Sequence, residues 1–426
     1  MKKILHQITI SFLAGSLLLT SCSKSFLTKT PGDSAPADQA LSDSSALQTA
    51  LYGAYSGLRA IDAYGRSLPV LGDLQADNSF VETSNAGRYL PDYNYSLAVN
   101  DGVALGIWQN LYAVIMRSNQ IIDAKPTGKL VGQIKAQAYA LRALSYFKLV
   151  NIFAKPYTDN KSALGVPLVL HYNLNYLPVR STVDSVYKQM VSDLKTALQT
   201  APSYTASTYL SKYAIEGLLA RTYLYMGDKV NAEATAVDVI NNSGFTLAAP
   251  GHFAEFWANP GIQTDAVEVM FEVDVDVHNN NGSDDLSIIY IPADRDNLKV
   301  IRLAEVYLVA AEAALPGDET TARFYLNALM AQRDLSFAGY TSTGAQLLSD
   351  IVQERRKELA FEGDRLYDLN RLGIPVTRVA NAGSIPGPLV YCLPRQQAGS
   401  AYSAIGSAGQ SQYSRTAECR LLVCYG

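Results

Sequence analysis

Hydrophobic residues recur at three- and four-residue spacing through most of the chain between residues 40 and 373. In the segment 106–124 such a stripe contains Trp108, Leu111 and Ile115, and we expect these side chains in the core of a helix bundle. The segments 134–154 and 181–198 keep the same period, and the second begins with a Ser/Thr capping signal. The pattern predicts a mainly α fold.

Helical segments also occur as pairs. In 213–244 and again in 301–334, small residues and an aromatic residue lead into a tight turn, after which small residues return. This order is typical of tetratricopeptide-like (TPR-like) hairpins, which stack into a solenoid. One such hairpin would not differ from any pair of helices, but several in one chain favour an α-α superhelix.

Two stretches, 64–102 and 245–297, break this pattern. They are rich in Pro, Gly and Asn, and the second holds two short strand-like runs. Long loops on a rigid helical scaffold are where binding residues usually lie. We therefore expect a loop-rich ligand-binding region with few short strands, inside a helical domain that covers 41–381.

The N-terminal segment reads as a targeting signal. Two lysines precede a short apolar run, which ends in Leu-Thr-Ser-Cys at Cys22. This ending resembles the lipobox of bacterial lipoproteins, so we expect residues 1–21 to be removed, Cys22 to be lipidated and residues 22–40 to act as a tether. The alternative is an ordinary secretory signal with a chance cysteine. No later run is long and apolar enough for a transmembrane helix.

Composition narrows the class of protein. The 426 residues carry a formal net charge of −4 without a basic stripe, which argues against nucleic-acid binding. No cysteine occurs between Cys22 and Cys392, so the body of the protein uses neither disulfides nor thiolate chemistry. The acidic stretch 274–285 lacks the ordered ligand spacing of a calcium loop. We expect no metal and no cofactor.

Half of the side chains in 354–373 are charged, against 17% in the whole chain. On a helix, Arg355, Glu358, Glu362 and Arg365 flank the apolar stripe, where a purely solvated face would oppose it. We predict a structural ion-pair network at a seam between helices. Gly363 is expected to break the helix and Asp364 to cap a short second one. Acid/base catalysis would instead need carboxylates that converge in a cleft.

This charged segment, together with "IRLAEVYLVAAEA" at 301–313, resembles the paired signature of the SusD/RagB family of outer-membrane nutrient-binding lipoproteins. The likeness extends over about residues 22–375. It implies a non-enzymatic lipoprotein, anchored by its lipid in the outer membrane and exposed at the cell surface. Such a protein would capture an oligosaccharide or peptide for import through a SusC-type TonB-dependent transporter. The helical superhelix would face that transporter.

The resemblance also suggests ligand-binding candidates. The family's first long loop aligns loosely with Asp77, Asn78, Arg88, Tyr89, Tyr93 and Asn94, and Asn280 and Tyr290 lie in the second loop. Sugars need flat aromatic faces and planar polar groups. Alternatively, Asp77 and Asn78 cap or turn the backbone while the tyrosines pack the loop onto the helices.

The chain departs from the family pattern in two places. The loop before residue 301 is shorter than usual, and the segment 382–426 lacks the expected Asn-Pro-rich ending. We hypothesise a reading-frame change near residue 390. Two other functions stay open: a TPR-like interaction scaffold without a small-molecule site, and a glycan-degrading enzyme. The enzyme is less favoured, since histidine is scarce and no nucleophile motif occurs.

Overall fold

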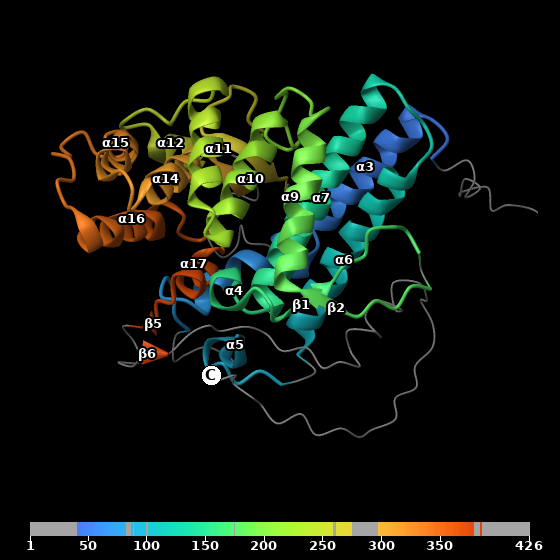
Figure 1. The fold of residues 1–426 in the computed structure, drawn as a ribbon, viewed down its shortest axis with the longest axis horizontal. Coiled ribbons are helices and arrows are strands. Elements are labelled where there is room, and N and C mark those ends of the chain that lie inside the picture. The colour runs from blue at the N-terminus through green and yellow to red at the C-terminus, as the bar shows by residue number, and fades with distance from the viewer. Residues whose placement is uncertain are drawn as a thin grey trace, which may run out of the picture.

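The computed structural model describes residues 41–81, 87, 89–98, 101–173, 175–258, 261–274, 297–378 and 384–385. Within these residues the fold is mainly α-helical with a few short strands, which confirms the predicted fold class (Figure 1). Cys22, the tether and the tail beyond residue 385 lie outside the described residues. No helix in the described part is long and apolar enough to cross a membrane.

Helices make up most of the described residues. In order they are α3 (Ser44–Leu58), the π-helical turn η2 (Ile61–Gly65), α4 (Ser67–Leu74), α5 (Leu90–Tyr93), α6 (Gly102–Asp123), α7 (Lys129–Phe153), α8 (Tyr157–Asn160), α9 (Val183–Leu198), α10 (Lys212–Met226), α11 (Lys229–Asn242), α12 (Phe253–Ala258), α14 (Leu303–Ala314), α15 (Glu319–Met330), α16 (Gly344–Glu358) and α17 (Arg365–Leu372). Longer connections separate α4 from α5, α8 from α9 and α12 from α14.

The first half of the molecule is a layer of long helices. Helix α7 packs against α6, α9 and α3, and these four stand side by side in Figure 1. Helix α7 is buried on nearly all sides, and its alanines let neighbouring helices approach closely. Trp108 lies in this core, as expected from its place on the apolar stripe.

The second half contains the predicted helical pairs. Gly227 ends α10 in the left-handed conformation, with φ of 71°, and the Asp228 side chain then caps α11. Asp318 caps α15 in the same way, after the turn that follows α14. Helix α14 packs against α10, α11, α15 and α16, so the pairs stack on one another as TPR-like units do.

One prediction about the first loop needs correction. Residues 67–74, which we expected within an irregular stretch, form helix α4, and every one of its residues is buried. Its proline, Pro69, lies in the first turn, where a missing N–H costs no intrahelical hydrogen bond. Burial of this apolar segment therefore outweighs its Pro and Gly content, and the irregular part begins after Leu74.

The strands form three antiparallel pairs: β1 (Leu164–Pro167) with β2 (Arg180–Thr182), β3 (Val269–Val273) with β4 (Leu298–Arg302), and β5 (Val376–Thr377) with β6 (Ser384–Ile385). In the second pair, Val273 lies opposite Leu298. β3 therefore lies inside the second predicted loop, 245–297, and the chain leaves β3 and returns to β4 at the same end of this hairpin.

Candidate functional site

The charged segment 354–373 is built into the interior. Arg302, at the end of β4, is fully buried and binds three carboxylates. Its Nη1 lies 3.0 Å from Glu268 and 2.7 Å from Glu358, and its Nε donates to Glu362 over 2.8 Å. Arg333 approaches Glu268 and Glu358 from the other side, at 2.6 and 2.9 Å. These pairs join β4 to α16 and to the turn after it.

A second group of ion pairs connects α10, α14, α16 and α17. Arg355 donates to Asp368 at 2.7 Å and to Glu305 at 2.9 Å. Arg221 of α10 binds the same Glu305 at 2.7 Å. Arg371 donates to Asp368 over 2.8 Å and also binds Glu312. Burial alone would raise the pKa of Asp368, but Arg355 and Arg371 hold it well below its usual value.

Each of the four residues singled out in the charged segment therefore has a charged partner. Arg355, Glu358 and Glu362 lie in the pairs above, and Arg365 binds Asp77. A catalytic pair would need carboxylates directed into an open cleft. Here the carboxylates of Glu358 and Glu362 face guanidinium groups inside the protein. This arrangement is that of a structural network.

The expected cap at Asp364 is wrong. Asp364 immediately precedes α17, but its side chain makes no hydrogen bond to the helix N-terminus. It binds Lys148 of α7 instead, and both groups are buried. A buried ammonium group without a counter-ion would cost more free energy than an uncapped N–H costs, so the carboxylate goes to the lysine.

The start of the first loop is tied to the same network. Arg365 donates to Asp77 through Nε at 2.7 Å and through Nη2 at 3.0 Å. Burial raises the pKa of Asp77, but Arg365 and Arg356 outweigh it and hold the pKa below its usual value. Asn78 accepts a hydrogen bond from Arg356 and donates one to Asp73. Both candidates are thus engaged by the protein itself.

The tyrosines of the first loop lie farther out, around an arginine that the sequence reading missed. The guanidinium of Arg378 lies 4.1 Å from the ring centre of Tyr93 and 4.8 Å from that of Tyr95. Arg378 also donates to the carbonyl oxygens of Leu74 and Ala76, at 3.0 and 3.1 Å, at the end of α4. It thereby fixes the loop to the helix.

The remaining first-loop candidates surround this cluster. Tyr89 is half-buried with a left-handed backbone, at φ of 60°, and the Arg66 guanidinium lies 6.0 Å from its ring centre. Tyr93 is buried, whereas Asn94 is exposed. Arg88, Asn280 and Tyr290 lie outside the described residues. Of the first-loop candidates that are described, Asn94 and Tyr89 are the two best placed for contact with a ligand.

The two predicted loops meet at this place. Val70, Leu74 and Tyr93 form a small apolar cluster, and both Tyr89 and Leu298 pack against it. Leu298 is the first residue of β4, where the chain returns from the second loop. In Figure 1 helices α4 and α5, which carry the cluster's buried residues, lie below the helical stack. We call this place the loop junction.

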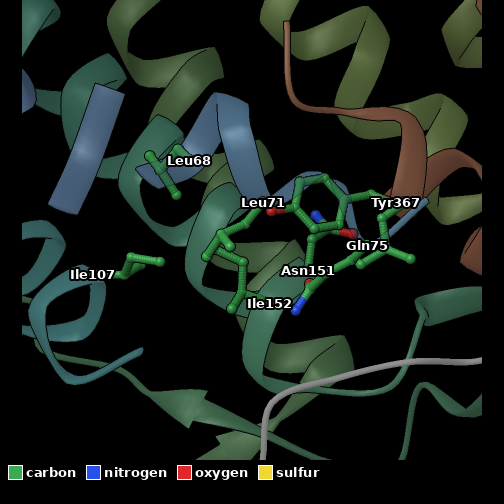
Figure 2. A pocket seen from close by; sticks show the side chains of 8 residues that line it. Leu68, Leu71, Gln75, Ile107, Asn151, Ile152 and Tyr367 are labelled. Carbon is green, nitrogen blue, oxygen red and sulfur yellow. The ribbon is translucent and has the colours of Figure 1, made fainter. Parts of the chain in front are cut away.

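A small cavity lies beside the junction but is not a sugar site. Its volume is about 10 Å³, room for about one water molecule. Figure 2 shows its polar side chains, Gln75, Asn151 and Tyr367, gathered on one side and apolar ones such as Leu68 on the other. Ligand pockets are typically several hundred Å³. Within the described residues, no group of three His, Cys, Asp or Glu side chains could hold a metal ion.

Sequence reasoning had little chance of finding Arg378 and Tyr95. Arg378 lies more than 280 residues from the tyrosines that it contacts. Its neighbours in sequence are unremarkable, with the two-residue strand β5 just before it. Tyr95 lies in the predicted loop, two residues after Tyr93, but was not among the candidates.

Comparison with known proteins shows to which family the sequence and the fold are similar. The family described as "Starch-binding associating with outer membrane" matches residues 25–224, and the SusD family matches residues 277–414. A SusD-like protein P2 from Formosa agariphila is 27% identical over 242 residues, which are 55% of this chain and 46% of that protein. A SusD-like protein from Bacteroides ovatus is 26% identical over 54% of this chain and 44% of its own length. The chain thus spans about half the length of these relatives.

Solved structures match over more of the chain. A SusD superfamily protein from Bacteroides thetaiotaomicron has a TM-score of 0.72 and 26% identity, covering 85% of this chain and 93% of that one. Another from Bacteroides fragilis has a TM-score of 0.74 at 21% identity, covering 83% and 97%, and shows the fold alone. With matches to both ends of its sequence and to its fold, this chain belongs to the SusD/RagB family.

Proposed function

We propose that this chain is a surface lipoprotein that binds an oligosaccharide at the loop junction and delivers it to a SusC-type TonB-dependent transporter. The observation that carries the proposal is the meeting of the two loops at Tyr89, Tyr93 and Leu298. Family membership supports it, because the family matched at the N-terminal half is described as starch-binding and associated with the outer membrane.

The chemistry of the junction fits a sugar better than a charged ligand. The partly exposed ring of Tyr89 supplies an apolar face for the C–H groups of a pyranose, and the exposed amide of Asn94 suits its hydroxyl groups. The carboxylate of Asp77 and the guanidinium of Arg365 neutralise one another nearby. A peptide is the other ligand class that the resemblance implies, and its binding is an outcome of the test below.

Attachment to the membrane is part of the proposal. Lipidation at Cys22 would leave residues 23–40 as the tether between the lipid and the helical domain. The domain would then be held at the membrane that contains the transporter. Metabolic labelling with a fatty acid tests it: label should enter the wild-type protein and not Cys22→Ser, and equal labelling would contradict lipidation.

Isothermal titration calorimetry tests ligand binding. We expect heat of binding with at least one neutral oligosaccharide from a panel that includes maltoheptaose and laminarihexaose, and none with a panel of oligopeptides. The variants Asn94→Ala and Tyr89→Ala should weaken binding, whereas Asn242→Ala, at the exposed end of α11, should not. Heat with peptides alone would favour peptide import, and heat with neither panel would contradict the proposal.

The second function is the scaffold, in which the stacked helical pairs bind only protein. Val230 of α11 and Phe324 of α15 are mostly exposed apolar side chains on these pairs. Single exposed apolar residues are common, so they do not by themselves favour the scaffold. Copurification with an outer-membrane barrel is expected under both functions. Calorimetry separates them, because a pure scaffold would give no heat with any small ligand.

A glycan-degrading enzyme is not supported by the matches, which are to a binding family. The densest carboxylates of the described residues pair with arginines, as shown above. Incubation of the purified protein with the oligosaccharide that it binds should leave the sugar intact on chromatography. Hydrolysis products that disappear in a Glu358→Gln variant would revive the enzyme.

A further inference from the structure

Two exposed tyrosines from distant parts of the sequence lie side by side. Tyr52 belongs to α3 and Tyr209 to the segment just before α10, and they are 49% and 37% exposed. Their ring centres are 6.2 Å apart and the rings are inclined by 47°. Single exposed aromatic residues are common on protein surfaces, but a pair held in one geometry requires a cause.

Tyr209 is held from below by the partly buried ring of Tyr55, which in turn lies against the buried ring of Phe271. Tyr55 meets Tyr209 edge-to-face at 5.6 Å, and Phe271 of β3 lies 6.1 Å from Tyr55. The Tyr55 hydroxyl donates to Gln137 Oε1 at 2.7 Å and accepts the Leu210 backbone N–H at 2.9 Å. Both the ring beneath Tyr209 and the backbone beside it are therefore fixed.

The segment that carries Tyr209 is itself rigid. The Ser207 backbone accepts the N–H of Glu272 at 2.8 Å and donates to the carbonyl oxygen of Gln263 at 2.9 Å. Its side-chain oxygen accepts the Gln263 N–H at 2.9 Å. A rigid aromatic surface loses little conformational entropy when a ligand binds, which favours affinity.

Polar groups surround the two rings. The exposed face of α3 carries Thr49 and Ser56 on either side of Tyr52, one turn away in each direction. On the other side, Tyr209 senses the carboxylate of Asp274: burial, Tyr52 and this negative charge together raise the pKa of the Tyr209 hydroxyl. Asp274 directly follows β3, where the second loop leaves the hairpin.

We propose that Tyr52 and Tyr209 form a stacking platform for one or two sugar units of a neutral oligosaccharide, a subsite additional to the loop junction. Apolar rings framed by hydroxyl groups are what a pyranose requires, with its C–H faces and hydroxyl rim. The platform adjoins the end of the β3–β4 hairpin where Asp274 follows β3. Leu298, which belongs to the loop junction, begins β4 at the same end, opposite Val273. The inference rests on the proposed function, since it gives a longer glycan a second contact.

The groups around the platform favour a neutral sugar over a protein partner and over an acidic glycan. A protein partner would need an extended apolar area, but the exposed neighbours of Tyr52 on α3 are Ser and Thr. An acidic glycan would lie close to the carboxylate of Asp274, which directly follows β3, the strand whose Phe271 ring lies 6.1 Å from that of Tyr55. These surroundings favour a neutral sugar.

The test compares matched pairs of exposed tyrosines. The double variant Tyr52→Ala/Tyr209→Ala removes the platform, and Tyr172→Ala/Tyr176→Ala removes tyrosines that are 41% and 48% exposed in the β1–β2 connection. Calorimetry measures the affinity of each variant for maltoheptaose, laminarihexaose and oligogalacturonate. For a neutral sugar that binds the wild type, we expect at least about a tenfold loss of affinity in the first variant and none in the second.

Further variants separate stacking from folding. Tyr52→Phe/Tyr209→Phe keeps the rings and should retain most of the affinity. Tyr52→Ala alone leaves the packing of Tyr209 on Tyr55 in place, so its loss of affinity cannot come from a loosened core. If the wild type binds sugar and the platform variants bind equally well, this inference fails and the proposed function stands. If the wild type binds no sugar, both fail.

Discussion

At the scale of single residues, the dominant feature is that arginines and glutamates are buried where most proteins place aliphatic side chains. Arg302 alone contacts Glu268, Glu358 and Glu362. A buried ion pair contributes little net stability compared with a well-packed apolar pair, because desolvation offsets the Coulomb attraction. Removing one partner is different, because it leaves the other charge buried and unpaired.

The first prediction concerns this asymmetry. Arg302→Met should lower the free energy of unfolding by about 3–5 kcal/mol, because three carboxylates lose their main counter-charge. Arg323→Met is the matched control, since Arg323 forms a surface pair with Glu319, worth less than about 1 kcal/mol, and its other contacts are to the Ser342 carbonyl and the Thr320 hydroxyl. Urea denaturation measures both. Equal stability of the two variants would show that the network is not structural.

A second prediction concerns pH. Burial raises the pKa of Glu362 from its ordinary value of 4.5 to about 7. Nearby glutamates raise this pKa further, whereas Arg302 lowers it without cancelling the effect of burial. The folded state therefore binds the proton more tightly than the unfolded chain. Stability from this group is complete below pH 4.5 and is lost as the pH rises towards 7.

The variant Glu362→Gln should remove that loss. We expect its unfolding free energy to fall less than that of the wild type between pH 4.5 and 7, measured by urea denaturation at several pH values. Glu255→Gln, an exposed position on α12, is the control and should follow the wild type. Parallel curves for the wild type and Glu362→Gln would contradict the raised pKa.

At the scale of elements, the turn between α16 and α17 depends on two glycines in contact. A Cβ added to Gly72 of α4 would lie 1.8 Å from the carbonyl oxygen of Gly363. Gly363 has φ of 82°, and a Cβ there would lie 2.4 Å from the Cα of Pro69. Backbone against backbone leaves no flexible side chain to move aside, so both positions require glycine.

The third prediction follows from this contact. Gly72→Ala should destabilise the protein by about 1–3 kcal/mol through overpacking. Gly53→Ala is the control, since Gly53 lies inside α3 with nothing near the added Cβ, and there alanine should stabilise by about 0.5–1 kcal/mol. Thermal unfolding followed by circular dichroism measures both. The same sign for the two variants would contradict this account.

The helices and their caps could be predicted from the sequence where residues close to one another in the chain determine them. Helical pairs with small residues and a capped turn, such as the one closed by Gly227 and Asp228, follow from spacing and cap chemistry alone. Helix α4 was missed because Pro and Gly suggested a loop, while burial of the whole segment decided otherwise. Asp364 was assigned a cap because the competing partner, Lys148, lies 216 residues away.

The candidate site also combines features that nearby residues predict with contacts between residues far apart in the sequence. The charged segment predicted its own involvement in ion pairs, but not that Glu362 would bind Arg302, that Asp364 would lie 3.6 Å from Arg221, or that Arg365 would bind Asp77. These contacts join residues between 60 and nearly 300 positions apart, which no local spacing encodes. The contacts of Arg378 are also between residues far apart in the sequence. The sequence indicated which loop carries the tyrosines, but not how their rings are arranged.

At the scale of the whole molecule, the residues of the ion-pair network and the tyrosines of the first loop lie in different places. The ion pairs connect the helices and β4 inside the protein, whereas the tyrosines of the first loop gather at the loop junction, where the second loop returns. A rigid interior with functional groups on connecting segments is a common arrangement for binding proteins. Capture of a glycan at the junction, with further contact at Tyr52 and Tyr209, is our account of the molecule.

The most direct test of that account is a crystal structure of the chain soaked with the neutral oligosaccharide that gives the largest heat of binding. We expect sugar density against Tyr89 and Asn94 at the loop junction, with Glu358 and Glu362 still bound to Arg302. Sugar density in contact with those glutamates, opened into a water-filled cleft, would contradict the account.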